Sequence, residues 1–178
     1  MNDTLWWATL VGAGVGVLLS LAASISRRHW LALPALLPAA AAIVLGVLAV
    51  ARPGAPWFSI VLGLAMLLLG TIGGSPLVAF VLSTAIEEYR TEERKPKAKR
   101  RGPEVLRGGA TIGHLERLAT MGAVLLGQPA AIAVVVAIKG LGRFSELDSS
   151  AVRERFIIGT LVSLGWAGAC TAAITLSW

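Results

Sequence analysis

The sequence predicts an all-α fold, a polytopic transmembrane helix bundle with about five spans. Of its 178 residues, 56% are hydrophobic and only 15% are charged, whereas a soluble domain carries roughly 25% charged residues. The apolar residues gather in runs of about 18 or more, the length that crosses the hydrocarbon core of a bilayer. We therefore expect a single integral membrane domain over residues 1–178, without a soluble domain of useful size.

The first two predicted spans cover residues 5–25 and 31–51. Small side chains recur at four-residue intervals along the first span, at Gly12, Gly16, Ser20 and Ser24. Small residues at this spacing allow two helix backbones to approach closely in lipid. We favour packing of this stripe against the protein's own helices over a dimerisation face.

The third apolar run, residues 57–86, is too long for one span. Its thirty residues correspond to about 45 Å of helix, against ~30 Å of hydrocarbon. We predict that this helix is broken at Gly73–Pro76, because a serine followed by a proline suits the start of a new helix. The break separates a span over 57–72 from a helix over 76–90. That helix is expected to be kinked or to lie at the interface, with a re-entrant hairpin as the less favoured alternative.

Residues 87–107 form a hydrophilic, basic loop that the positive-inside rule places in the cytoplasm. The N-terminus is then outside the plasma (inner) membrane of a bacterium. A cluster in this loop is a candidate contact for anionic lipid: Lys95, Lys97, Lys99, Arg100 and Arg101. One turn violates the rule, because residues 139–155 carry four basic side chains on the predicted outer side. Either its charge has a role, or the span count is wrong by one.

The fourth predicted span, over 118–138, has a polar centre. Arg117, Gln128 and Lys139 are eleven residues apart, so they lie near one face of a continuous helix. Arg117 and Lys139 would then be about 33 Å apart and would anchor the helix at opposite interfaces. Gln128 would lie near the midplane, where an amide needs hydrogen-bond partners. We favour a helix-packing role for it over a place on a solute path.

The fifth predicted span, over 156–174, carries a second stripe of small side chains suited to close packing. Trp166 lies near its middle, and its indole N–H requires an acceptor. If the fourth and fifth spans are antiparallel, we expect Gln128 and Trp166 to approach each other. His114 is a candidate for proton handling, and the segment 139–144, with Lys139 and Arg143, is a candidate for holding an anionic headgroup or a partner's carboxylate. An ordinary interfacial histidine and a solvated turn are the simpler interpretations of these two.

Several segments carry a resemblance: GGSPLVAFVLS, LRGGATIGHLERLA, GQPAAIAVVVAIKGLGRF and ERFIIGTLVSLGWA. Together they resemble the C-terminal half of an uncharacterised family of small multi-pass membrane proteins of actinobacteria and other bacteria. The resemblance covers about residues 70–170 and implies an integral membrane protein. It implies no activity, ligand or catalytic residue.

The positions of the reactive side chains favour a protein that is not an enzyme. All ten acidic residues lie in predicted loops or at helix ends, and the single cysteine lies in an apolar run. We expect no catalytic residue, no metal site and no cofactor. Nucleic acid is not an expected partner, because the basic loop lacks interleaved aromatic residues.

For the function, we expect an accessory or scaffold subunit that acts by helix–helix association in the membrane, with a second copy or with a membrane-complex partner. Its support is the pair of small-residue stripes and the lack of a soluble catalytic domain. The alternative is a small oligomeric transporter or channel with Gln128 near its path.

Overall fold

The computed structural model is a helical bundle, and it describes residues 2–26, 28–48, 50, 56–92, 109–144 and 149–178. Three helices are long, namely α1 (Asn2–Ser26), α3 (Pro56–Glu92) and α6 (Ser150–Leu176). Each contains a segment that is long and apolar enough to cross a membrane. No strand occurs in the described residues, which confirms the predicted all-α class, and the three long apolar helices are consistent with a membrane protein.

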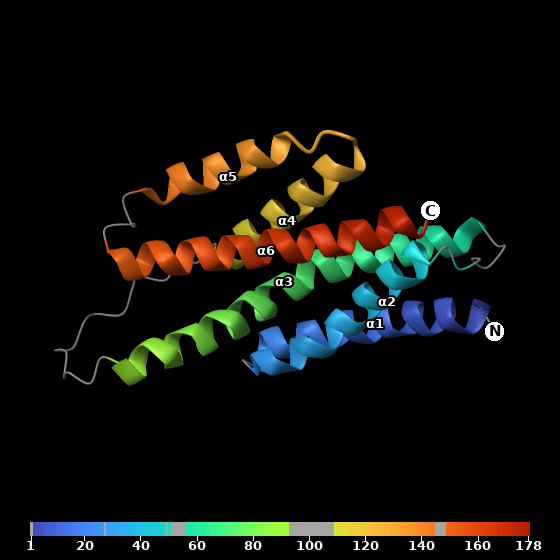
Figure 1. The fold of residues 1–178 in the computed structure, drawn as a ribbon, viewed down its shortest axis with the longest axis horizontal. Coiled ribbons are helices and arrows are strands. Elements are labelled where there is room, and N and C mark those ends of the chain that lie inside the picture. The colour runs from blue at the N-terminus through green and yellow to red at the C-terminus, as the bar shows by residue number, and fades with distance from the viewer. Residues whose placement is uncertain (1, 27, 49, 51–55, 93–108, 145–148) are drawn as a thin grey trace.

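The other helices are shorter and form two consecutive pairs. The 3₁₀ helix η1 (His29–Ala35) leads directly into α2 (Leu36–Val47), and both pack on α1. They occupy most of the predicted second span, 31–51. The second pair is α4 (Gly109–Leu125) and α5 (Ala131–Gly142), which form a hairpin beside α6 (Figure 1).

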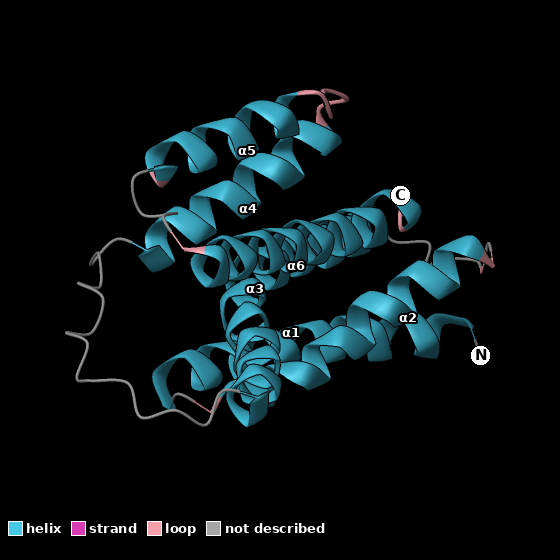
Figure 2. Cartoon of the chain, turned by 60° about the vertical axis from the view of Figure 1, so that its left-hand side comes forward, coloured by secondary structure: helices cyan, strands magenta, loops and turns pink. Residues whose placement is uncertain are grey.

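The helix ends fall into two groups, which we name after what they hold. The junction end holds the ends of α1, α3 and α5 and the starts of η1, α4 and α6 (Figures 1 and 2). The terminal end holds both chain termini, the start of α3 and the turn of the hairpin. Both arms of the hairpin therefore connect to the rest of the chain at the junction end.

The predicted break at Gly73–Pro76 is wrong, because α3 is one helix of 37 residues. Its glycines make room for neighbouring side chains. A Cβ atom on Gly74 would lie 2.5 Å from the Cδ atom of Arg117, and one on Gly70 would lie 2.6 Å from the sulfur of Met121. Pro76 is tolerated inside the helix, as proline is in membrane helices. The segment predicted as the separate helix 76–90 is thus the second half of α3.

The basic loop begins later than the sequence predicts. Since α3 continues to Glu92, the loop predicted over 87–107 is helical in its first part. The lysine and arginine cluster proposed to contact anionic lipid, residues 95–101, lies outside the described residues.

The predicted continuous span over 118–138 is also wrong, because two helices joined by a turn replace it. α4 ends at Leu125 and α5 begins at Ala131. Gly127 has a φ of 70°, a left-handed conformation that glycine adopts readily at a helix end. Pro129 has no N–H group and cannot continue the hydrogen-bonding of α4. Glycine and proline together therefore turn the chain back on itself.

The buried core lies where α1, α2, α3 and α6 meet. Its largest fully buried apolar side chains include Trp6, Phe58, Leu62, Met66 and Leu69. α4 adds Met121 to this core. In contrast, none of the residues of α5, all of which the structure describes, is buried. The hairpin thus has one arm inside the bundle and one arm at its periphery (Figure 2).

Candidate hairpin chamber

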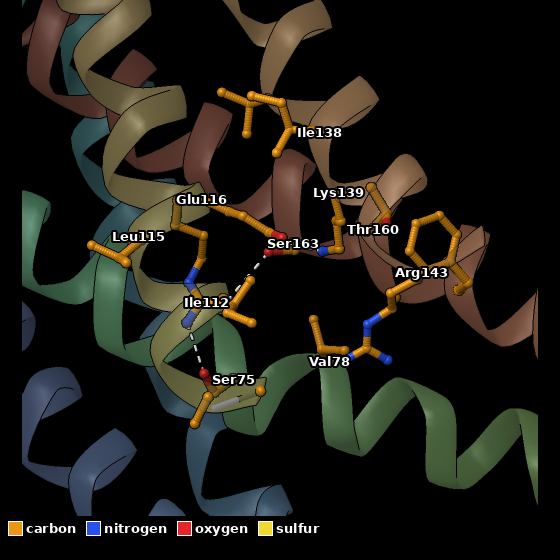
Figure 3. A pocket seen from close by; sticks show the side chains of 18 of the residues that line it. Ser75, Val78, Ile112, Leu115, Glu116, Ile138, Lys139, Arg143, Thr160 and Ser163 are labelled. Atoms are coloured by element: carbon orange, nitrogen blue, oxygen red, sulfur yellow. Dashed lines mark hydrogen bonds and ion pairs between the residues drawn. The ribbon is translucent and has the colours of Figure 1, made fainter. Parts of the chain in front are cut away.

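A cavity of about 690 Å³ lies between the α4–α5 hairpin and helices α3 and α6. We call it the hairpin chamber. Much of its wall is apolar, with Val78, Ile112, Val135, Ile138 and Phe156 contributed by all four helices. Polar and charged side chains also line it, so the chamber has an amphipathic wall (Figure 3).

Arg117 fastens α4 to both long helices. Its side chain is 2% exposed. The Nε atom donates to the carbonyl oxygen of Thr71 (2.8 Å), and the Nη2 atom donates to the hydroxyl of Ser75 (2.7 Å). The Nη1 atom donates to the hydroxyl of Ser163 on α6 (3.3 Å). The predicted role of Arg117 as an interfacial anchor that reaches water is therefore wrong.

Glycines on two helices give Arg117 its space. A Cβ atom on Gly74 would lie within 3 Å of three atoms of the arginine side chain. On α4 itself, a Cβ atom on Gly113 would lie 3.3 Å from Nη1. The side chain thus lies directly against the backbone of α3, where the carbonyl oxygen of Thr71 is within reach.

Lys139 lies beside Glu116, the residue that precedes Arg117. The prediction that Lys139 and Arg117 lie at opposite membrane interfaces is therefore wrong. Its Nζ atom forms an ion pair with the Oε2 atom of Glu116, at 2.5 Å, across the hairpin. The same Nζ atom is 6.0 Å from the ring centroid of Phe156 on α6. The hairpin turn brings α5 back along α4, which explains why the predicted separation of about 33 Å is wrong.

Trp166 has its acceptor, but the acceptor is not Gln128. The indole Nε1 atom donates to the carbonyl oxygen of Leu69, at 3.2 Å, and the ring packs against Gly73. Gln128 is exposed in the hairpin turn. The expected approach of Gln128 to Trp166 does not occur, because the turn removes Gln128 from the interior face that a continuous helix would have given it.

Of the two remaining candidates, His114 and Arg143, only one lines the chamber. His114 is half-buried on α4 but is not part of the chamber lining. Arg143, at the end of α5, is half-buried and lines the chamber. The structure therefore brings together Arg117, Lys139 and Arg143 among the predicted residues, and leaves Gln128 apart.

Other polar residues of the chamber were not predicted as site residues. Glu116 and Ser75 are two of them. Ser163 belongs to the small-residue stripe of the fifth predicted span. Arg155 and Thr160 on α6 complete the set. The available signal was the Gly-Gln-Pro sequence, since a turn there places Glu116 opposite Lys139.

The arrangement is suited to binding an anionic amphiphile. Among the described residues, four cationic side chains and one carboxylate line the chamber: Arg117, Lys139, Arg143, Arg155 and Glu116. An apolar wall beside a cationic one can hold the two parts of an amphiphile. No group of three or more His, Cys, Asp and Glu side chains suited to a metal ion occurs within the described part of the chain.

Comparison with known proteins adds no functional assignment to this geometry. No protein-family model matches the chain, and neither a curated protein nor a solved structure matches it.

Proposed function

We propose that this is a multi-pass protein of the bacterial plasma membrane with four crossing segments and one re-entrant hairpin. The crossing segments are α1, η1 with α2, α3 and α6. The hairpin enters from the junction end and returns to it. Support comes from helix length, since α4 and α5 correspond to about 25 Å and about 18 Å, less than ~30 Å of hydrocarbon. The apolar α5 has no buried residue, and lipid is a suitable environment for it.

This topology removes the violation of the positive-inside rule. Five crossings would place the basic turn over 139–155 opposite the basic loop. A re-entrant hairpin instead puts both on one side, with Arg28. Apart from Arg52 and the buried Arg117, every lysine and arginine of the sequence then falls on or faces that side. The rule assigns it to the cytoplasm, with the N-terminus outside.

Many backbone polar groups of the hairpin turn form hydrogen bonds within the hairpin. A turn at membrane depth needs such hydrogen bonds because the hydrocarbon core supplies no water. The N–H groups of Leu126, Gly127 and Gln128 donate to carbonyl groups in the last turns of α4, and Pro129 has no N–H group. An exposed turn with few unpaired donors supports a hairpin that ends within the membrane or at its far interface.

For the function itself, the chamber favours uptake and binding of a membrane lipid. The observation that carries this proposal is an amphipathic cavity of about 690 Å³ between a re-entrant hairpin and two crossing helices. Its volume is within the roughly 300–1,000 Å³ of ordinary ligand sites. The apolar wall suits acyl chains, and the peripheral position of α5 gives a lipid a lateral path from the bilayer.

The association function expected from the sequence has lost part of its support. Gly12 and Gly16 pack against Pro38, Ala35 and Leu69 of the same chain, and Ser163 binds Arg117. Residues of both small-residue stripes thus make contacts within the protein. The stripes can be explained without a partner protein. The transport alternative was centred on Gln128, which lies outside the chamber lining.

A photoactivatable lipid tests the proposal. The full chain is placed in nanodiscs with a phospholipid that carries a diazirine on its acyl chain, and labelled peptides are identified by mass spectrometry. We expect labelling of chamber residues on α4, α5 and α6. Val135→Trp fills the chamber and is expected to lower this labelling at least about fivefold, the effect of roughly 1 kcal/mol of binding energy.

The matched control is Val134→Trp on the same helix. Val134 is 58% exposed and does not line the chamber, so its replacement should leave chamber labelling unchanged. Equal labelling in the two tryptophan variants, or labelling confined to the outer surface of the bundle, would contradict the proposal.

A further inference from the structure

Cationic side chains from two segments of the chain line the chamber. Lys139 lies in the last turn of α5, Arg143 caps the C-terminal end of that helix, and Arg155 lies near the start of α6. Figure 3 shows Lys139 and Arg143 extending from α5 toward the centre of the chamber. All three lie toward the junction end, because α5 ends there and α6 starts there (Figure 1).

Among the described residues, the chamber lining contains more cationic than anionic side chains. Glu116 supplies the one carboxylate of the described lining, and Lys139 is paired with it. The three described hydrogen-bond acceptors of Arg117 are a carbonyl and two hydroxyl groups, all uncharged. The lining therefore carries more positive than negative charge, and its electrostatic field attracts an anion.

A buried hydroxyl in the chamber lining has no hydrogen-bond partner among the described residues. Thr160 is only 7% exposed, and its Oγ1 atom is buried without a hydrogen bond. Thr160 lines the chamber one turn before Ser163. A buried polar atom left unpaired is unfavourable, so an acceptor brought in by a ligand would satisfy it.

The remaining lining indicates what carries the anion. Val78, Ile112 and Phe156 make an apolar surface beside the cationic wall. A free phosphate ion would fill a small part of about 690 Å³ and would leave this surface uncovered. A lipid fills both parts, since its phosphate takes the cationic wall and its acyl chains cover the apolar one.

We infer that the hairpin chamber binds the phosphate group of an anionic membrane lipid, with Arg155, Arg143 and Thr160 as its recognition residues. The inference rests on the proposed lipid-binding function and adds the chemistry of the headgroup. Arginine suits this task, because its planar guanidinium group binds phosphate oxygens in pairs. The headgroup lies toward the junction end, so the lipid comes from the leaflet on that side.

Headgroup competition in nanodiscs tests this inference. Phosphatidylglycerol and diacylglycerol are compared, each with the same diazirine-labelled acyl chains, in a phosphatidylcholine bilayer. We expect phosphatidylglycerol to label the chamber about tenfold more than diacylglycerol, since a charge-assisted hydrogen bond gives at least that factor. Inorganic phosphate is then added at increasing concentration and is expected not to displace the lipid.

Two substitutions connect the selectivity to named residues. Arg155→Gln is expected to lower the preference for phosphatidylglycerol about tenfold, whereas Arg153→Gln, on the same helix and outside the chamber lining, leaves it unchanged. Thr160→Val should lower the labelling by phosphatidylglycerol about fivefold, the value of one hydrogen bond. The same variant should not lower the thermal stability of the lipid-free protein, because the hydroxyl has no partner there.

The outcomes separate this inference from the function beneath it. Equal chamber labelling by the two lipids keeps the lipid-binding function and overturns the phosphate specificity. Displacement by inorganic phosphate keeps the anion site and overturns the lipid as its carrier. Absence of chamber labelling by either lipid overturns the proposed function itself.

Discussion

The two arms of the hairpin come from one apolar run of the sequence, yet they are held by different forces. α4 lies against α3 and α6 and contributes the buried side chains of Arg117, Thr120 and Met121. α5 contributes none and packs mainly on α4. Its described links across the chamber are the Lys139 ion pair with Glu116 and the 6.0 Å approach of Lys139 to the Phe156 ring.

This difference shows how a chamber can exist inside a small bundle. α4 is fixed because a buried arginine with three hydrogen bonds joins it to two long helices. α5 stands away from α6, and the space between them is the chamber. A firmly packed arm beside a peripheral arm is the arrangement that the proposed lipid-binding function requires.

The largest expected effect comes from removing the anchor of α4. Arg117→Ala deletes three hydrogen bonds and leaves a void, and we expect it to lower the free energy of unfolding by about 2–4 kcal/mol. The measurement is unfolding by sodium dodecyl sulfate in mixed micelles. Arg117→Met keeps most of the apolar stem and separates packing from hydrogen bonding. If Arg117→Met unfolds as the parent protein does, hydrogen bonds do not hold α4 in place.

A smaller effect is expected from closing the space that Arg117 occupies. A Cβ atom on Gly74 would lie 2.5 Å from Cδ of Arg117, so we expect Gly74→Ala to lower the free energy of unfolding by about 1–3 kcal/mol through overpacking. Gly63→Ala on the same helix is the control, because its Cβ atom would meet Trp178 at an ordinary 3.5 Å. That variant should be neutral or stabilising, since alanine favours helix. Equal losses in both variants would show that Arg117 moves aside at no cost.

The smallest effect on stability is expected at the link to α5. Lys139→Met removes the partner of Glu116 and should destabilise the closed hairpin by about 1 kcal/mol, as befits a half-buried ion pair. The measurement is amide hydrogen exchange of α5 peptides, which should accelerate while exchange in α4 stays unchanged. Exchanging the two charges, in Glu116→Lys with Lys139→Glu, should restore protection. Faster exchange of both arms to the same degree would mean that the hairpin opens as one unit.

The sequence predicted two of the three long helices well because their physical signal is local. Apolar runs long enough for a bilayer identify α1 and α6, with bounds within several residues of the predicted 5–25 and 156–174. The errors lie where glycine and proline admit more than one interpretation. Gly-Gly-Ser-Pro resembles a break but forms a groove for Arg117 and Trp166. Gly-Gln-Pro lies inside the predicted continuous span over 118–138 but forms a turn.

The candidate site was predicted only in part, because the turn at Gly-Gln-Pro was not predicted. Arg117, Lys139 and Arg143 were identified as unusual charges in an apolar region, but a continuous helix placed Arg117 and Lys139 at opposite interfaces. Glu116 and Thr160 gave no signal, because neither residue type in that position is unusual until the hairpin folds. Periodicity along a helix cannot bring together residues that meet only across a turn.

The sequence by itself determined that the chain is helical and suited to a membrane, since composition and the length of apolar runs set how much surface must avoid water. The tertiary structure decided that the predicted fourth span folds back on itself and lines a cavity together with α3 and α6. The reason is that Gly127 and Pro129 permit a turn without requiring one. What favours the folded-back form is the set of long-range contacts it creates, above all Arg117 on α3 and α6 and Lys139 on Glu116.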